Sequence, residues 1–346
     1  MNSILVVILV IGLIIIVHEL GHYMAAKAAG VRVDEFAVGM GPKILGIKHG
    51  ETDYSLRAIP LGGYVRLAGM EPGEKDDQRA FNNKTVLQRM VVVFAGSFMN
   101  FLLAVVLFIM LYSVIGMSVP VHSNVVGQVI AGHPAEQAGL QAGDQVTAIN
   151  GKTISDWPGL TQIVQQNPGN SLAITVQRDD NILQIEVVPM ENPQTGLGML
   201  GIMSAEPIYF YTITYPFWEG VVLGVGESIT WLSRILDSLI VLVTGQGSVD
   251  DLAGPVGIVQ MTGEASQQGF GVLLYFVAIL SLNIGFINLL PIPALDGSRL
   301  IFLGIEGVRG KPIDPEKENL VHLVGFALLI ILIIVVTYND ILRIFN

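Results

Sequence analysis

The chain has 346 residues, of which 51% are hydrophobic and 14% are charged, and its formal net charge is −11. This apolar composition excludes an ordinary soluble domain and favours a membrane protein with several spans and one soluble insert. The acidic balance argues against nucleic acid as a partner. The absence of cysteine excludes disulfides and thiolate ligands, so any zinc must be held by His, Asp or Glu.

The first apolar run covers residues 4–22 and ends in His18-Glu19-Leu20-Gly21-His22. On a helix, the i, i+4 spacing places both imidazoles on one face, where they can bind one ion, with Glu19 beside them as a base for the attacking water. The motif therefore predicts a zinc site inside the membrane, with His18 and His22 as ligands. In the alternative interpretation, these polar residues only anchor the helix end at the membrane interface.

Further apolar runs of spanning length lie at about 90–116, 270–290 and 320–338. With the first run they predict four transmembrane helices. Basic residues give the orientation, because ten Lys or Arg lie between residues 27 and 89 and only two lie between 120 and 205. By the positive-inside rule, we expect both termini and the long segment 120–205 to be extracytoplasmic, and the metal site to lie toward the cytoplasmic side.

Residues 220–244 are a fifth candidate span. Their polar residues recur at three- and four-residue steps: Glu227, Thr230, Arg234 and Asp237. Such a stripe favours an amphipathic helix lying in the membrane interface. The count matters, because a fifth crossing would invert the third apolar run and turn its polar end away from His18.

The loop after the first span contains β-like runs over residues 43–69, around a polar turn at 48–51 and interrupted by Pro60 and Gly62-Gly63. We expect a cytoplasmic β-hairpin beside the metal site, whose exposed edge can hold a substrate peptide by β-augmentation. An ordinary cytoplasmic loop is the alternative. His49 is expected to be a solvated turn residue.

Residues 121–190 alternate short β-like runs with turns, and the string from Pro134 to Asp144, followed by Val146 and Asn150-Gly151, is similar to bacterial PDZ domains of the protease-associated type. That similarity implies a groove between a strand and a helix that takes a peptide or chain end. A steric filter that keeps bulky outer domains away is the alternative. The insert shows no catalytic constellation.

The third apolar run ends in two prolines and an Asp-Gly pair, within residues 283–297. Pro291 and Pro293 remove backbone donors and are expected to end the helix. Asp296 is the candidate for the third protein ligand that a catalytic zinc needs. A simple Asp-Gly turn is the alternative.

Three features together carry a family resemblance: HELGH at 18–22, NLLPIPALDG at 288–297, and FNNKTVLQRMVVVFAGSFMNF at 81–101. With the PDZ-like insert, they resemble the site-2 protease family of intramembrane zinc metalloproteases, in its bacterial RseP-like branch with one PDZ domain, over nearly the whole chain. The resemblance implies zinc ligands at His18, His22 and Asp296, and Glu19 as general base. It places substrate contacts at Asn288, Pro291, Pro293, Gly62, Gly63 and Tyr64.

Two positions depart from the family pattern. Ser97 stands where the family often has Pro in an A-G-P-x-x-N string, and Ser298-Arg299 stand where Gly-His is common. Neither position is a candidate ligand. The departures bear on substrate preference more than on the chemistry.

We therefore expect a polytopic α-helical membrane protein of four regions: 1–116 with two spans, the metal motif and the β loop; 121–205, a PDZ-like α+β domain; 206–269, an interfacial amphipathic helix region; and 270–346, the last two spans. The expected function is zinc-dependent cleavage of single-span membrane proteins in a bacterial plasma membrane, such as trimmed anti-sigma factors or remnant signal peptides. A metal-ion carrier would not need Glu19 beside His18, and a non-catalytic PDZ scaffold would lose little if Glu19 were changed. The sequence gives no oligomeric state.

Overall fold

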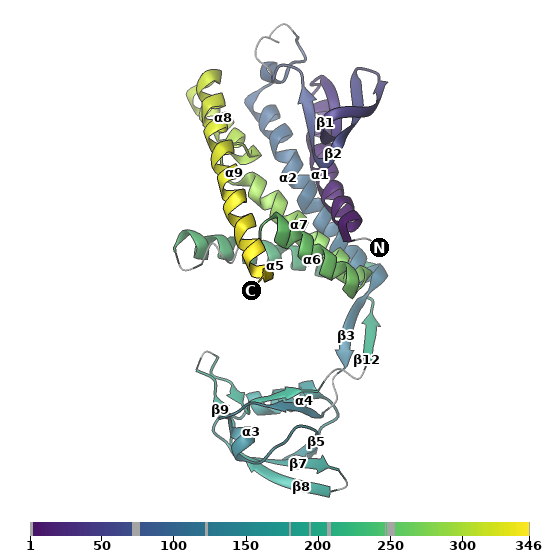
Figure 1. Ribbon diagram of the computed structural model, residues 1–346, viewed down its shortest axis with the longest axis vertical. Coiled ribbons are helices and arrows are strands. Elements are labelled where there is room, and N and C mark those ends of the chain that lie inside the picture. The colour runs from purple at the N-terminus through teal and green to yellow at the C-terminus, as the bar shows by residue number, and fades with distance from the viewer. Residues whose placement is uncertain are drawn as a thin grey trace. The chain divides into compact units, whose positions relative to one another are not determined.

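The computed structural model of the chain describes residues 3–70, 77–121, 124–179, 181–193, 195–205, 209–245, 247 and 253–345. Two compact units make up the chain: a membrane unit of residues 1–116 and 214–346, and an insert unit of residues 117–213. Long helices dominate the membrane unit, and strands dominate the insert unit (Figure 1).

Four helices of the membrane unit are long and apolar enough to cross a membrane. They are α1 (Ser3–Ala28), α2 (Val86–Met110, continued by a π-helical turn at Leu111–Ile115), α7 (Phe270–Leu289) and α9 (Pro315–Phe345). The prediction of four apolar membrane helices is thereby confirmed. Helix α2 begins before the expected residue 90 because Thr85 and Gln88 form a capping box that starts the helix at Val86.

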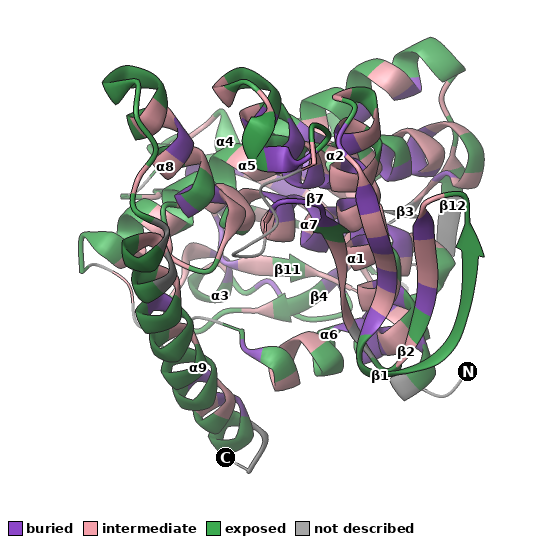
Figure 2. Cartoon of the chain, turned by 90° about the horizontal axis from the view of Figure 1, so that it is seen from above, coloured by how far each residue is buried: buried purple, intermediate pink, exposed green. Residues whose placement is uncertain are grey.

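Helices α1 and α7 run toward one end of the membrane unit, and α2 and α9 run toward the other (Figure 1). Helix α2 packs against both α1 and α7. Its approach to α1 is close, because a Cβ atom on Gly21 would lie 2.2 Å from the Ala95 carbonyl oxygen. Helix α9 is exposed along most of its length (Figure 2), and it packs on α6, where Asp340 accepts a hydrogen bond from the Gly257 N–H at 2.8 Å.

The loop after α1 forms two long, bent strands, β1 (Val33–His49) and β2 (Thr52–Leu67). The hairpin turn lies at residues 50–51, within the predicted 48–51. His49 is exposed as expected, but it is the last residue of β1 and pairs with Thr52. The strands extend beyond the predicted range, because residues 33–38 pair with 63–67 on one side and with 53–56 on the other. The outer edge of residues 63–67 has no partner among the described strands. The Val65 backbone hydrogen-bonds to Glu19, and a strand edge of this kind can pair with a further strand.

The region expected at 206–269 begins with a strand, β12 (Tyr209–Ile213), followed by α5 (Phe217–Val243) and α6 (Pro255–Gln268). Helix α5 packs on α2 through small buried residues of one face: Gly220, Gly224 and Ser228. Glu227 accepts hydrogen bonds from the Tyr275 hydroxyl on α7 at 2.7 Å and from Trp231 at 3.0 Å. At least this member of the predicted polar stripe therefore faces the protein interior.

The insert unit contains the predicted β-like runs as strands β4 (Val126–Val129), β5 (Gln145–Ile149), β7 (Leu172–Arg178) and β8 (Asn181–Val187). Its main sheet has the order β6-β5-β7-β8, with β6 at Lys152–Thr153. Alternate residues of β7 enter the core, as the period of a half-buried strand requires. The PDZ-like α+β character is completed by two helices and the remaining short strands: α3 (Pro134–Gln137), α4 (Trp157–Gln165), β9 (Met190–Glu191), β10 (Gly198–Met199) and β11 (Ile202–Ser204).

The insert unit begins and ends in a two-stranded ribbon. Strand β3 (Met117–Val121) pairs antiparallel with β12, so that Met117 and Ile213 are direct partners. The unit therefore spans 117–213, wider than the expected 121–205. The ribbon therefore holds the first and last residues of the insert unit, Met117 and Ile213, next to each other.

Candidate metal centre

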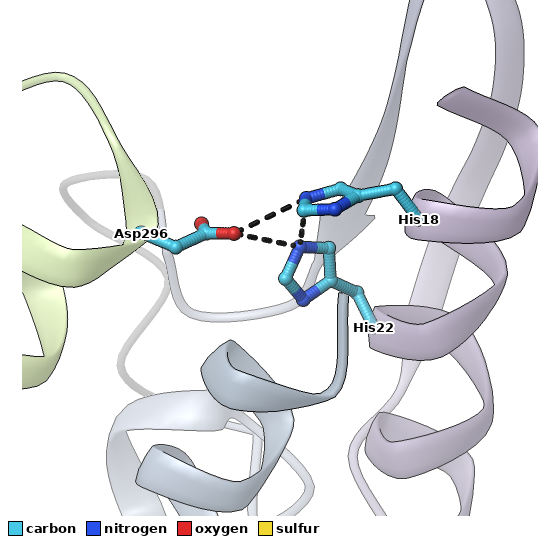
Figure 3. Close-up of side chains that lie close together, drawn as sticks. All are labelled: His18, His22 and Asp296. Carbon is cyan, nitrogen blue, oxygen red and sulfur yellow. Dashed lines mark hydrogen bonds and ion pairs between the residues drawn. The ribbon is translucent and has the colours of Figure 1, made fainter. Parts of the chain in front are cut away.

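Three side chains from distant parts of the sequence, His18, His22 and Asp296, converge within the membrane unit (Figure 3). His18 and His22 lie one turn apart on α1, and Asp296 is the first residue of α8 (Asp296–Arg309). The two imidazole Nε2 atoms are 3.1 Å apart, and each lies 3.2 Å from Asp296 Oδ2. Within the described residues, this is the one group of three or more His, Cys, Asp or Glu side chains close enough to hold a metal ion.

The spacing and chemistry of these three atoms fit zinc. Asp296 Oδ2 is buried and has no well-formed hydrogen bond, although both imidazoles are near. Tetrahedral zinc with bonds of about 2.0–2.1 Å separates its ligand atoms by about 3.3–3.4 Å, which matches the 3.1 and 3.2 Å observed here. Calcium and magnesium prefer all-oxygen sites. The group thus suits a zinc ion with three protein ligands and a free fourth position.

Helix α2 supplies partners for the outer nitrogens of both rings. His22 Nδ1 donates to the Val92 carbonyl oxygen at 2.9 Å, which leaves Nε2 unprotonated. His18 Nδ1 lies 3.3 Å from the Asn100 side-chain amide, whose own Oδ1 is buried without a partner. Because amide oxygen and nitrogen are interchangeable in shape, turning Oδ1 toward the ring lets His18 Nδ1–H donate to it. Both histidines then present an Nε2 lone pair to a metal.

Close backbone approaches make room for this centre. A Cβ atom on Gly96 of α2 would lie 2.4 Å from His22 Nε2 and 2.8 Å from His18 Cε1. Neither Gly96 nor Asn100 was predicted from the sequence as a site residue. Their i, i+4 spacing in an apolar span, which puts a small and a polar residue on one helix face, is the signal that points to them.

A cavity of about 500 Å³ lies over the centre. His18, Glu19, His22 and Asp296 line it, together with Tyr64 of β2. The neighbouring strand residue Gly63 packs directly on the proposed base, because a Cβ atom there would lie 3.2 Å from Glu19 Cγ. The unpaired strand edge and the Glu19 carboxylate are therefore neighbours.

The other predicted substrate contacts lie outside the cavity lining. Asn288 is in the last turn of α7, which ends at Leu289 before Pro291, as the prolines predicted. Pro293 packs instead against Gly325 of α9. Gly62 adopts φ +94° and faces the side chain of Met40. The cavity thus brings together only part of the predicted substrate-binding set.

A buried carboxylate fixes the cavity wall formed by β2. Glu35 of β1 accepts hydrogen bonds from the Ser55 hydroxyl at 2.6 Å, Arg57 at 2.6 Å and the Tyr64 hydroxyl at 2.8 Å. Burial alone would raise the pKa of Glu35, but these hydrogen bonds outweigh it and lower the pKa to about 2. The charged Glu35 therefore ties Tyr64 to the rest of the hairpin.

A model of peptidase family M50 matches residues 6–332. The chain belongs to peptidase family M50. A Clostridium acetobutylicum protein with a zinc metalloprotease name is 40% identical over 339 residues, covering 98% of this chain and 97% of its own length. Zinc metalloprotease RasP of Oceanobacillus iheyensis is 36% identical, with 100% of both chains covered. Regulator of sigma-W protease RasP of Bacillus subtilis is 34% identical, with 99% of both chains covered.

Among solved structures, the PDZ domain of an SdrC-like protein from Listeria monocytogenes is 21% identical over 25% of this chain and 93% of its own length, with a TM-score of 0.23. The family assignment itself rests on the near full-length matches. The predicted site-2 protease family, metallopeptidase class and zinc cofactor are confirmed by them. The chain is an intramembrane zinc metallopeptidase that acts on membrane proteins.

Proposed function

We propose that this chain cuts a peptide bond within the transmembrane helix of single-span membrane proteins, near the cytoplasmic side of a bacterial plasma membrane. The convergence of His18 Nε2, His22 Nε2 and Asp296 Oδ2 supports the proposal most directly. The two histidines lie in an apolar helix of spanning length, where polar groups are costly and usually serve a function.

Each group at the centre then has a chemical role. His18, His22 and Asp296 would hold the zinc ion, which would supply Lewis-acid chemistry toward the scissile carbonyl and the attacking water. The Glu19 carboxylate accepts the proton of the attacking water and passes it to the leaving amine. Asn100 and the Val92 carbonyl keep the imidazoles oriented.

A substrate helix must unwind before it can react, because its peptide bonds are hidden in backbone hydrogen bonds. Residues 63–67 offer an unpaired strand edge beside Glu19, and an extended substrate can add to that edge as a further strand. Gly63 and Tyr64 are the assigned contacts at the cavity. Gly62, Asn288, Pro291 and Pro293 would contact the substrate beyond it.

The proposed topology has four spans, with both termini and residues 121–205 outside and the metal centre toward the cytoplasm. Helices α1 and α7 run in the same direction (Figure 1), and the segment after α7 leads to α8, whose first residue Asp296 lies beside His18 and His22. Residues 206–269 are assigned to the outer membrane interface, and 1–116 and 270–346 to the paired spans.

Single-cysteine labelling tests this topology, because the chain has no cysteine of its own. Probes at Ser171 and Asn346 should label from outside the cell, and a probe at Glu74 only from inside. Glu74 and Asn346 lie outside the described residues. If Asn346 labelled from the cytoplasm, the number of crossings would be odd, and α5 would have to be a span.

The insert unit has one of two roles in substrate choice. Its groove takes a peptide or chain end, or the unit acts as a size filter against bulky outer domains. Trimmed anti-sigma factors and remnant signal peptides suit both roles. The Bacillus subtilis relative carries the name Regulator of sigma-W protease RasP. That name favours trimmed anti-sigma factors as substrates.

The experiment that tests the activity uses purified full-length protein in detergent and a single-span substrate without its outer domain. Mass spectrometry of the products should locate the cut within the apolar segment of the substrate. A chelator should abolish the cut, and added zinc should restore it. A cut confined to the polar flanks, or one that persists in chelator, would contradict the proposal.

A further inference from the structure

The loop that carries Asp296 contains an unusual backbone conformation. Ala294 adopts φ +78°, in the left-handed region that residues with a Cβ atom rarely occupy. Its backbone N–H donates to His322 Nδ1 at 3.0 Å, across 28 residues of sequence. A strained loop next to a metal ligand is thus secured by one side chain from the last helix.

Helix α9 also packs closely on this loop about one helical turn after His322. A Cβ atom on Gly325 would lie 2.1 Å from Pro293 Cβ. The His322 ring also packs against Phe302 of α8, with ring centroids 5.7 Å apart. The contacts of His322 thus include both the residue two positions before Asp296 and the helix that Asp296 begins. The reaction proposed above assigns no role to these contacts of His322.

We propose that His322 is a positioning residue for Asp296. It holds Ala294 in the left-handed conformation, and so sets where the start of α8 places the carboxylate relative to His18 and His22. The inference rests on the proposed function in one respect, the assignment of Asp296 as a metal ligand. It adds that the metal centre depends on α9, although α9 supplies no ligand.

Two substitutions of similar polarity separate this role from simple packing. Asn places an amide oxygen near the position of His Nδ1, so His322→Asn retains an acceptor for the Ala294 N–H. Gln reaches toward the position of Nε2 and leaves the Nδ1 position empty, so His322→Gln removes that acceptor. Leu328→Ala changes an exposed residue of the same helix and is the matched control.

The test measures zinc affinity by chelator competition on the purified full-length variants, alongside kcat and KM for the single-span substrate. His322→Gln should weaken zinc binding about 10- to 100-fold, the usual effect of losing a residue that supports a ligand, and should lower kcat with little change in KM. His322→Asn should recover most of both quantities, and Leu328→Ala should match the unaltered protein.

A further variant probes the backbone directly. Gly occupies the left-handed region without a Cβ clash, so Ala294→Gly should restore part of the zinc affinity lost in His322→Gln. A double variant that binds zinc no better than His322→Gln would overturn the proposal, because the Ala294 conformation would then not be what His322 maintains.

Failure of this proposal differs from failure of the proposed function. Unchanged zinc affinity in His322→Gln, or equal losses in the Gln and Asn variants, would overturn the positioning role while Asp296→Ala still lost zinc. If Asp296→Ala also bound zinc normally, the ligand assignment itself would be wrong. Should His322→Gln fail to fold, Ala294→Gly alone must keep normal zinc affinity, and a loss there would equally overturn the proposal.

Discussion

The two units treat their buried polar groups differently. In the insert unit, buried Asp144 accepts two hydrogen bonds from Arg178, at 2.6 and 2.8 Å, and one from the Gln141 N–H. Among the described residues, every buried side-chain polar atom without a hydrogen-bond partner lies in the membrane unit. Three of these atoms, on Asn100, Asp296 and His322, belong to the metal centre or its support.

This difference indicates that the buried polar groups of the membrane unit serve chemistry, whereas those of the insert unit serve stability. Buried polar groups are normally satisfied, so a cluster of unsatisfied ones calls for an explanation. In the insert unit, an apolar core and satisfied charges stabilise a fold. In the membrane unit, the unsatisfied Asp296 Oδ2 faces the two histidine Nε2 atoms, in a group that would hold a zinc ion. We therefore expect substitutions in the membrane unit to change zinc binding and activity, and substitutions in the insert unit to change stability or substrate choice.

The largest effect is expected from Glu19→Gln, which keeps the size of the side chain and removes its ability to accept a proton. Turnover should fall by about 10²- to 10⁴-fold, the usual contribution of a general base, while zinc content stays normal. Metal analysis and cleavage of the single-span substrate are measured together. Glu136→Gln, at an exposed position of the insert unit, is the control, and normal turnover by the Glu19 variant would rule out the assigned base.

A pair of aspartates tests the separation of the units directly. Asp296→Ala should lose zinc and activity, because the centre then has only two ligands. Asp144→Ala should keep zinc bound but destabilise the insert unit, because Arg178 loses its partner. Zinc content and the thermal unfolding of both variants decide the matter. A fully loaded Asp296→Ala protein would show that the ligand set has been assigned incorrectly.

Removal of the insert unit should change which substrates are cut and leave the chemistry intact. Because Met117 and Ile213 are paired partners, a short linker can join Gly116 to Thr214. The deletion protein should bind zinc, should cut a substrate already stripped of its outer domain, and should reject an untrimmed one less strictly.

The control for this deletion is a demonstration that the shortened protein folds and retains metal. If it did so and yet cut neither substrate, the insert unit would have to take part in catalysis. The contrast between a catalytic unit and a selecting unit would then be wrong.

The smallest effect concerns acid stability of the hairpin. Since the pKa of folded Glu35 is about 2, below its ordinary value of 4.5, its stabilisation is present above pH 4.5 and is lost as pH falls toward 2. The contribution is about 1–3 kcal/mol after allowance for solvent screening. Hydrogen exchange of β2 against pH should show this loss in the unaltered protein, and Glu35→Gln should lack it. Glu186→Gln, at an exposed site on β8, should behave as the unaltered protein.

The sequence by itself determined the elements whose signals are local. The i, i+4 histidines on an apolar helix predicted one shared face, Pro291 predicted the end of α7, and short β-like runs separated by turns predicted the strands of the insert unit. The pairing of HELGH with a distant Asp-Gly motif predicted the three candidate ligands, because zinc needs three protein donors.

Only the tertiary structure decided the features that depend on contacts between distant segments. Residues 33–42 were not predicted as strand; of these, residues 33–38 pair with two separate parts of β2, residues 53–56 and 63–67. The roles of Gly96 and Asn100 follow from the close approach of α2 to α1. The role proposed for His322 follows from the hydrogen bond that it accepts from the Ala294 N–H. No sequence pattern around Ala294 indicates its left-handed conformation. Such contacts are set by packing and close approach, whereas sequence periodicity reports only which face of its own element a residue occupies.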